Sequence, residues 1–107
     1  MKPIPLLLLA ALALSACNPN CTEAVYEDVK AAVAEELKSP STASFPPLSK
    51  IKATGNQTKT LCTPTFTGYV DAQNKFGAIV RLDYVASAIR KTPDQPAKVY
   101  ILKLEER

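Results

Sequence analysis

The sequence has 107 residues, among them 13 lysines and arginines, 10 acidic residues, three cysteines and no histidine. This length allows one domain and excludes a two-domain enzyme with a cleft between its lobes. The mixed charges, with a formal net charge of +3, give no electrostatic footprint for nucleic acid, and the missing histidine removes the commonest general base and metal ligand.

Residues 1–16 form a segment of their own, because 12 of these 16 residues are apolar. Lys2 supplies a positive charge, and the apolar run from Ile4 to Leu14 is too short to cross a bilayer, which takes about 20 apolar residues. A charged start followed by a run of this length is typical of an export signal. We therefore expect residues 1–16 to be a signal peptide.

The stretch Leu14-Ser15-Ala16-Cys17 resembles the lipobox of bacterial lipoproteins, in which Leu and two small residues precede the Cys that receives the lipid. Leu14 fits an ordinary cleavage site poorly, since that site takes small residues at the first and third positions before the cut. The resemblance implies that Cys17 carries a diacylglyceryl group, becomes the mature N-terminus and is then N-acylated. The alternative is a soluble periplasmic protein in which Cys17 has no such role.

The same resemblance implies a location in the cell envelope. In enterobacterial lipoproteins an Asp after the lipidated Cys retains the protein at the inner membrane, and Asn18 stands at that position here. We expect a lipid anchor in the outer membrane, with the protein facing the periplasm. Residues 17–20 then form a lipidated tether, and three extended residues span only about 10 Å, so the domain is expected to lie against its membrane.

Three cysteines in an exported protein leave one without a partner, and lipidation of Cys17 explains the odd one. Cys21 and Cys62 are then free to form a disulfide that closes a loop of about 40 residues and contributes roughly 4 kcal/mol. Two thiols so far apart, with no histidine, do not make a zinc site. We expect no metal and no other cofactor.

Residues 21–107 are expected to form the folded domain. Its first expected element is an amphipathic helix over residues 21–38. Its apolar positions recur every four residues, at Val25, Val29, Val33 and Leu37. Asn20 can cap its start. Ser39-Pro40 is expected to end it, because proline cannot continue the helix.

A short strand is expected over Leu48 to Thr54, ending at Gly55-Asn56. In such a strand Lys50 and Lys52 would share one side, which is a common protection for an exposed edge.

The next two strands are expected to form a hairpin. Asn74-Lys75-Phe76-Gly77 carries the type I turn signature, followed by a glycine able to adopt positive φ. This three-residue loop fixes the register, and the expected cross-strand pairs are Ala72 with Val80, Val70 with Leu82, Gly68 with Tyr84 and Asp71 with Arg81. The apolar side chains of both strands then share one face.

A last strand is expected over Lys98 to Glu105, with Tyr100, Leu102 and Leu104 on the core face. The predicted architecture is an α+β domain in which one N-terminal helix packs on a four-stranded antiparallel meander stapled by one disulfide.

Two segments, LKSPSTASFP (residues 37–46) and GYVDAQNKFGAIVR (residues 68–81), are similar to a small domain that recurs in uncharacterised bacterial and phage-encoded proteins. The resemblance spans about half of the mature chain. It implies the fold more than the function, because that family brings no established reaction or ligand.

The hairpin tip is the first candidate interaction surface, because recognition often lies on exposed loops. Asp71, Asn74, Phe76 and Arg81 are its members. Each also has a structural interpretation: Asn74 makes the turn, Asp71 and Arg81 form a cross-strand pair, and the Phe76 ring folds back onto the sheet.

The sheet face away from the helix is the second candidate. Branched aliphatic residues recur there in the expected pattern, at Ile79, Val85, Ile89, Val99 and Ile101. Such a surface suits another protein or a second copy. The alternative is that the loop over residues 55–61 folds across it.

The residues argue against catalysis, because the chain has no histidine, no spare thiol and no glycine-rich phosphate loop. We therefore expect a non-catalytic, membrane-anchored module that binds an envelope protein and takes no nucleic acid or small-molecule substrate. One alternative is an inhibitor, giving immunity or exclusion against a toxin, a phage or a conjugation component. Another is a structural lipoprotein that maintains envelope integrity.

Overall fold

The computed structural model describes residues 21–57 and 61–107, and the expected signal peptide over residues 1–16, Cys17 and Asn20 lie outside these ranges. Helix α2 (Cys21–Glu35) is followed by two short 3-10 helices, η1 (Pro40–Thr42) and η2 (Leu48–Lys50). Four strands complete the domain: β1 (Lys52–Gln57), β2 (Cys62–Gln73), β3 (Ile79–Ile89) and β4 (Lys98–Glu106). The expected α+β architecture is confirmed.

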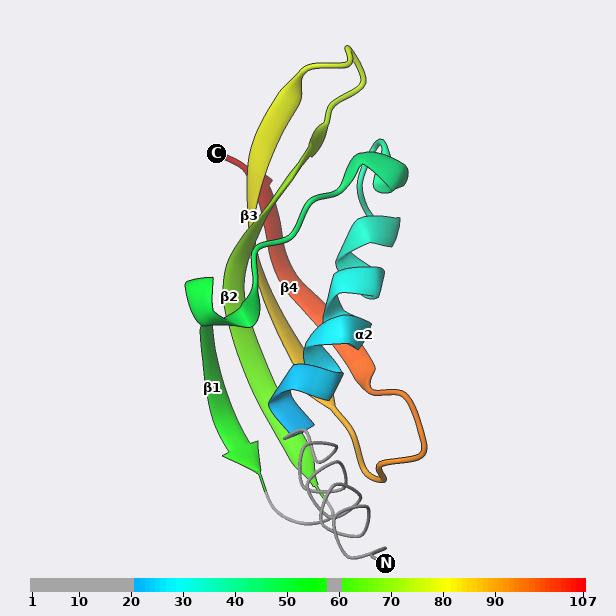
Figure 1. Cartoon of the computed structure of the whole chain (residues 1–107), viewed down its shortest axis with the longest axis vertical. Coiled ribbons are helices and arrows are strands. Elements are labelled where there is room, and N and C mark those ends of the chain that lie inside the picture. Colours follow the sequence, from blue (N-terminus) through cyan, green and yellow to red (C-terminus); the bar gives the residue numbers. More distant parts are fainter. Residues whose placement is uncertain (1–20, 58–60) are drawn as a thin grey trace, which may run out of the picture.

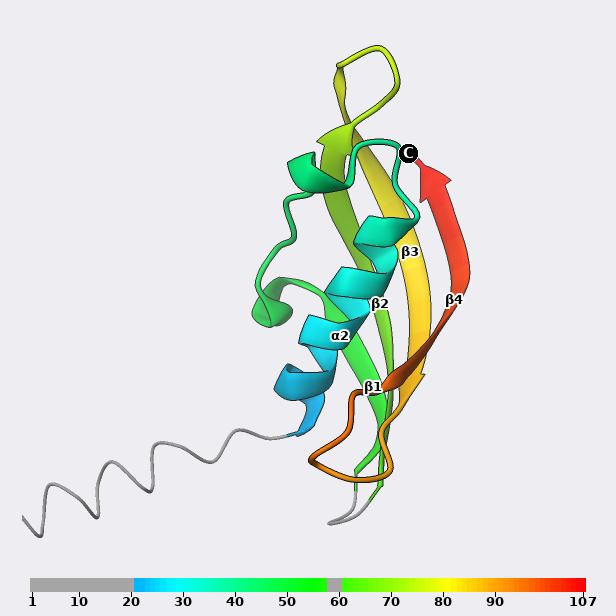
Figure 2. The same cartoon turned by 90° about the vertical axis from the view of Figure 1, so that its right-hand side faces the viewer.

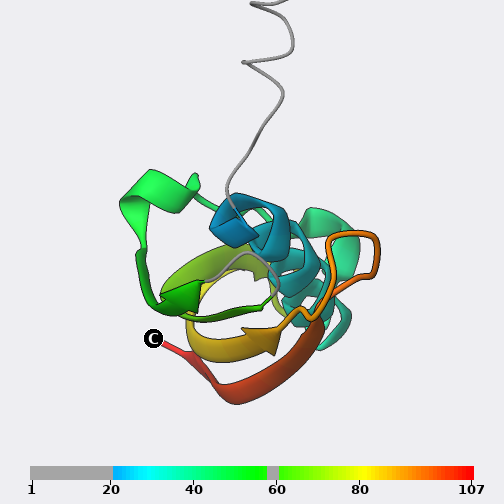
Figure 3. The same cartoon turned by 90° about the horizontal axis from the view of Figure 1, so that it is seen from below.

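The strands form one antiparallel sheet in the order β1-β2-β3-β4, so each strand pairs with its neighbour in the sequence. Helix α2 lies along one face of this sheet (Figures 1 and 2). Seen from below, the strands make a curved layer with α2 on one side (Figure 3). We call the side without α2 the outer face.

The core lies between α2 and the inner face of the sheet. Val25, Val29 and Val33 of the helix are fully buried, as their spacing predicted. They meet a row of inward-facing sheet residues on β2 and β3: Phe66, Val70, Ala72, Tyr84, Ala86 and Ala88.

Helix α2 ends at Glu35, before the expected stop at Ser39-Pro40. The chain leaves the helix through tighter turns, in which Glu36 N donates to Val33 O at 3.0 Å and Leu37 N donates to Ala34 O at 3.1 Å. These bonds keep Leu37 turned into the core.

The disulfide between Cys21 and Cys62 is present, with the two Cα atoms 6.3 Å apart. It joins the first residue of α2 to the first residue of β2. The beginning of the domain and the beginning of its longest strand are therefore held at the same end.

The register of the β2-β3 hairpin is confirmed at all four expected pairs. Asn74 closes the turn, since its backbone N donates to Ala78 O at 2.9 Å and its Oδ1 accepts from Phe76 N at 2.9 Å. Gly77 takes the expected positive φ, at 86°. Turn chemistry and side-chain alternation select the same register here.

The expected start of the first strand was wrong. Leu48–Lys50 is the 3-10 helix η2, and β1 begins only at Lys52, so Lys50 and Lys52 do not share a strand. Gly55 lies inside β1 with φ at 125°, and a Cβ there would stand 2.4 Å from Thr63 O. The strand continues through this glycine to Gln57 because no side chain obstructs the close approach to β2.

The expected faces of β4 were wrong over its first half. The register shifts at a β-bulge, because Val85 pairs with Lys103 while Ala86 pairs with Ile101, which leaves Leu102 without a partner. Before the bulge Val99 and Ile101 pack against the core, and Tyr100 and Leu102 are exposed. After it Leu104 returns to the core face, as expected.

Candidate functional site

The hairpin tip stands at the end of the molecule opposite the start of α2 (Figure 1). Phe76 is 82% exposed there, so its ring does not fold back onto the sheet. The Lys75 ammonium lies 5.2 Å from the centre of that ring. An exposed aromatic ring beside a cation on a hydrogen-bonded turn suits recognition of another protein.

Asp71 and Arg81 form the expected cross-strand pair on the outer face. Arg81 donates to both carboxylate oxygens, at 2.7 and 2.9 Å. Its guanidinium also lies 4.2 Å from the centre of the Tyr69 ring. The hydrogen bond from Arg81 holds the pKa of Asp71 below its usual value.

A second ion pair stands on the same face, between Asp83 and Arg107. Arg107 donates to Asp83 at 2.5 and 3.1 Å, and this hydrogen bonding holds the pKa of Asp83 below its usual value. Neither pair includes a residue of the turn at 74–77.

The aliphatic residues expected on the outer face are divided between the two faces. Ile79, Val85 and Ile89 of β3 do lie on it, with Ile79 63% exposed and Ile89 37% exposed. Val99 and Ile101 lie on the other side and pack against the core, because the bulge shifts the alternation of β4. Those two residues are not part of an outer-face surface.

Tyr100 and Leu102 take the places that were assigned to Val99 and Ile101. They are 47% and 65% exposed, and Tyr100 pairs with Ser87 on the outer face. The sequence carries no clear signal for this exchange, because both alternating sets of side chains in this part of β4 are apolar. The position of the bulge decides which set faces the core.

The outer face also carries an open hollow of about 540 Å³, which we call the outer-face hollow. Four cationic residues line it: Lys50, Lys52, Lys103 and Arg107. Among the described residues that line it, only Asp83 has a side-chain carboxylate, and Arg107 forms an ion pair with it. The sequence alone does not reveal this cluster, because its residues come from η2, β1 and β4 and are brought together by pairings that depend on the bulge.

Tyr84 lies beneath the hollow in the core, with its side chain fully buried. Its hydroxyl has no hydrogen-bond partner among the described residues, while the neighbouring Tyr26 donates to Pro46 O at 2.6 Å. Burial raises the pKa of Tyr84, and the nearby Tyr26 adds to the shift. A tyrosine with a raised pKa is an inert neutral group at physiological pH.

Within the described ranges, no three His, Cys, Asp or Glu side chains gather closely enough to hold a metal ion. No helix in the same ranges is both long and apolar enough to span a bilayer.

Comparisons of the chain with family models, with curated proteins and with solved structures found no match. The likeness of Cys17 and its preceding residues to a lipobox, and of the two internal segments to a phage-type domain, stays a prediction.

Proposed function

We propose that this protein is a non-catalytic lipoprotein of the bacterial cell envelope, anchored through a lipid on Cys17, which binds another envelope protein with its hairpin tip. The anchor rests on the export signal and the lipobox-like residues 14–17. The absence of catalysis rests on the missing histidine and the pairing of the two remaining thiols.

One observation carries the choice of the hairpin tip. The disulfide joins the start of β2 to Cys21, four residues after Cys17 in the sequence, and β2 then runs for 12 residues, about 40 Å, to the turn. A lipid at Cys17 therefore directs Phe76 away from the membrane. The most exposed aromatic ring of the described residues is thus presented where a second protein in the periplasm can reach it.

Site-specific photocrosslinking in living cells tests this proposal. A photoreactive phenylalanine replaces Phe76 in one variant and Gln95 in a control variant, because Gln95 is also exposed but lies in the loop at the opposite end. We expect a discrete protein adduct at position 76 that is absent at position 95. We also expect that adduct to be lost when Cys17→Ser removes the anchor.

Equal adducts at positions 76 and 95, or no adduct at position 76, would contradict binding through the tip. An adduct at position 76 that persists unchanged with Cys17→Ser would contradict the role of the lipid in presenting it. Circular dichroism of each variant confirms that the domain is folded.

A further inference from the structure

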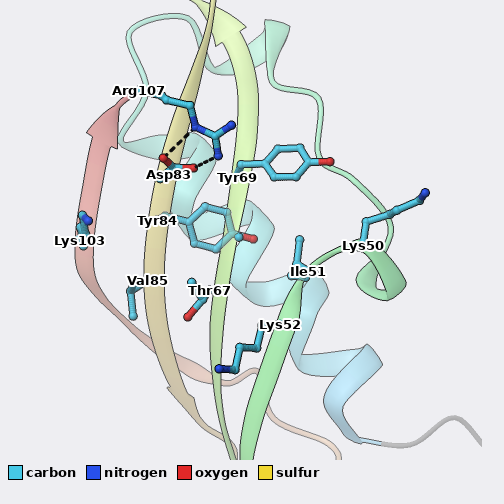
Figure 4. A pocket seen from close by; sticks show the side chains of 11 residues that line it. Lys50, Ile51, Lys52, Thr67, Tyr69, Asp83, Tyr84, Val85, Lys103 and Arg107 are labelled. Carbon is cyan, nitrogen blue, oxygen red and sulfur yellow. Dashed lines mark hydrogen bonds and ion pairs between the residues drawn. The ribbon is translucent and has the colours of Figure 1, made fainter.

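The outer-face hollow is separate from the hairpin tip and is not used in the proposed function. It lies over the middle of the sheet, between η2 and the second half of β4 (Figure 4). Its lining is rich in hydrogen-bond donors, because lysine and arginine side chains and the hydroxyls of Thr67 and Tyr69 contribute to it. Few aliphatic side chains contribute, so an apolar ligand has little to contact.

Four residues of the lining form one row across the outer face. Lys52 pairs with Thr67, Thr67 pairs with Val85, and Val85 pairs with Lys103. The backbones of Lys52 and Lys103 are therefore three strand spacings apart, at about 4.8 Å for each spacing. Figure 4 shows Lys52 and Lys103 on opposite sides of the hollow, with Thr67 and Val85 between them.

Much of the positive charge in the hollow is not neutralised. Neither Lys50 nor Lys52 takes part in an ion pair with any described residue. Lys103 has a loose contact of 3.5 Å with Glu105. Asp83 is already engaged by Arg107, so it does not offset the lysines.

We propose that the outer-face hollow binds a ligand through a phosphate group held between Lys52 and Lys103, with the Thr67 hydroxyl as a third donor. Two cationic residues at the two ends of one row favour an anion with more than a single negative charge. A free or monoester phosphate carries nearly two charges and three acceptor oxygens. Those oxygens match the two ammonium groups and the hydroxyl. Lys50 at the rim adds to the field that draws the anion in.

Titration calorimetry of the full chain, purified from membranes in a non-ionic detergent, tests this proposal at low ionic strength. Inorganic phosphate is the probe for a free phosphate, and glycerol 3-phosphate, a monoester like the headgroup of a phosphatidate lipid, is the probe for a phospholipid headgroup. Malonate serves as the carboxylate control. We expect saturable binding of at least one phosphate probe, and weaker binding of malonate.

Matched variants locate the binding. Lys52→Gln and Lys103→Gln are each expected to weaken binding about fivefold, because each removes one charged donor. Lys98→Gln is the control, since it lies in the same strand β4 but outside the hollow, and we expect less than a twofold change.

The two phosphate probes distinguish the sources. Tighter binding of inorganic phosphate identifies a free phosphate, and tighter binding of glycerol 3-phosphate identifies a monoester headgroup. Either result supports the proposal if the binding depends on Lys52. The proposal is overturned if neither probe binds, if malonate binds as tightly as the phosphates, or if Lys98→Gln weakens binding as much as Lys52→Gln.

Discussion

Tyr84 faces Gly68 across β2 and β3 in the middle of the core. A Cβ at position 68 would stand 2.9 Å from the Tyr84 hydroxyl and 3.0 Å from Cγ2 of Ile51. Because Tyr84 is fully buried, its ring has little room to move aside. The missing side chain of Gly68 is what allows a large aromatic residue to fill this part of the core.

We predict that Gly68→Ala lowers the free energy of unfolding by about 1–3 kcal/mol through this clash. Tyr84→Phe alone is expected to cost little, because the hydroxyl that it removes has no hydrogen-bond partner among the described residues. The double variant should recover part of the loss, since the nearest obstructing atom is gone. Urea denaturation of the four proteins measures this coupling.

Gly77→Ala provides the control for that cycle. Position 77 has positive φ, but a methyl group there would meet no atom within 4 Å, so the cost comes from the backbone alone, about 1 kcal/mol. Tyr84→Phe should not reduce it. Equal rescue at both glycines would contradict a local clash at position 68.

The two ion pairs of the outer face predict a stability that depends on acid pH. Hydrogen bonds from Arg81 and Arg107 lower the pKa values of Asp71 and Asp83 below the ordinary value of 3.8. A carboxylate with a lowered pKa in the folded state stabilises the fold above its unfolded pKa, and this contribution is lost as the pH falls through the folded pKa. Both pairs are exposed, so the effect is small.

We therefore expect the free energy of unfolding to decline as the pH falls below 3.8, and to decline less in a variant with Asp71→Asn and Asp83→Asn. Denaturant unfolding across the acid range, from neutral pH to well below the ordinary carboxyl pKa, measures this. Asp94→Asn is the control, because Asp94 makes no ion pair with a described residue. An unchanged slope in the double variant would show that other groups cause the acid dependence.

At the scale of the elements, the disulfide that joins α2 to β2 is expected to make the largest contribution of any single contact between elements to the free energy of unfolding. It closes a loop with a sequence separation of 41 residues, for which restriction of the unfolded chain is worth about 4 kcal/mol. Replacing both Cys21 and Cys62 by Ala should lower the free energy of unfolding by roughly that amount. Thermal unfolding monitored by circular dichroism measures it.

Reduction of the intact protein gives an independent comparison, because it opens the bond without removing the sulfur atoms. Dithiothreitol should lower the melting temperature of the wild type but not that of the double alanine variant. A loss under about 1 kcal/mol in both experiments would mean that packing of α2 on the sheet restricts the chain enough by itself.

The sequence allowed the hairpin and the helix to be predicted, because in each a local signal and a long-range pattern agree. Asn74 and Gly77 define the turn, and the alternation of β2 and β3 fits the register that this turn requires. The bulge at Leu102 could not be predicted, since it is selected by the pairing with β3 and not by residues within β4. For that reason the prediction that Val99 and Ile101 lie on the outer face was wrong.

The cationic hollow could not be predicted for a related reason. Its lysines come from η2, from a strand whose start was expected at Leu48 and lies at Lys52, and from β4 beyond the bulge. Only the combined register of three strand pairs places Lys52 and Lys103 in one row. Sites formed by long-range pairing depend on such details more than the fold class does.

At the scale of the whole molecule, the arrangement has two ends with different chemistry. One end holds the disulfide and the start of α2, directly after the residues that resemble a lipid attachment site. The other end presents an exposed Phe76 on a hydrogen-bonded turn. A lipid at Cys17 would place the disulfide end next to the membrane and the Phe76 end away from it.

Intact-mass spectrometry of the protein extracted from membranes tests the anchor most directly. We predict that the wild type has the mass of residues 17–107 plus a diacylglyceryl group and one further acyl chain, and that Cys17→Ser yields a chain without these additions that keeps residues 1–16. A wild-type protein of unmodified mass, recovered from the soluble fraction, would contradict the lipid anchor and the orientation of the hairpin tip that depends on it.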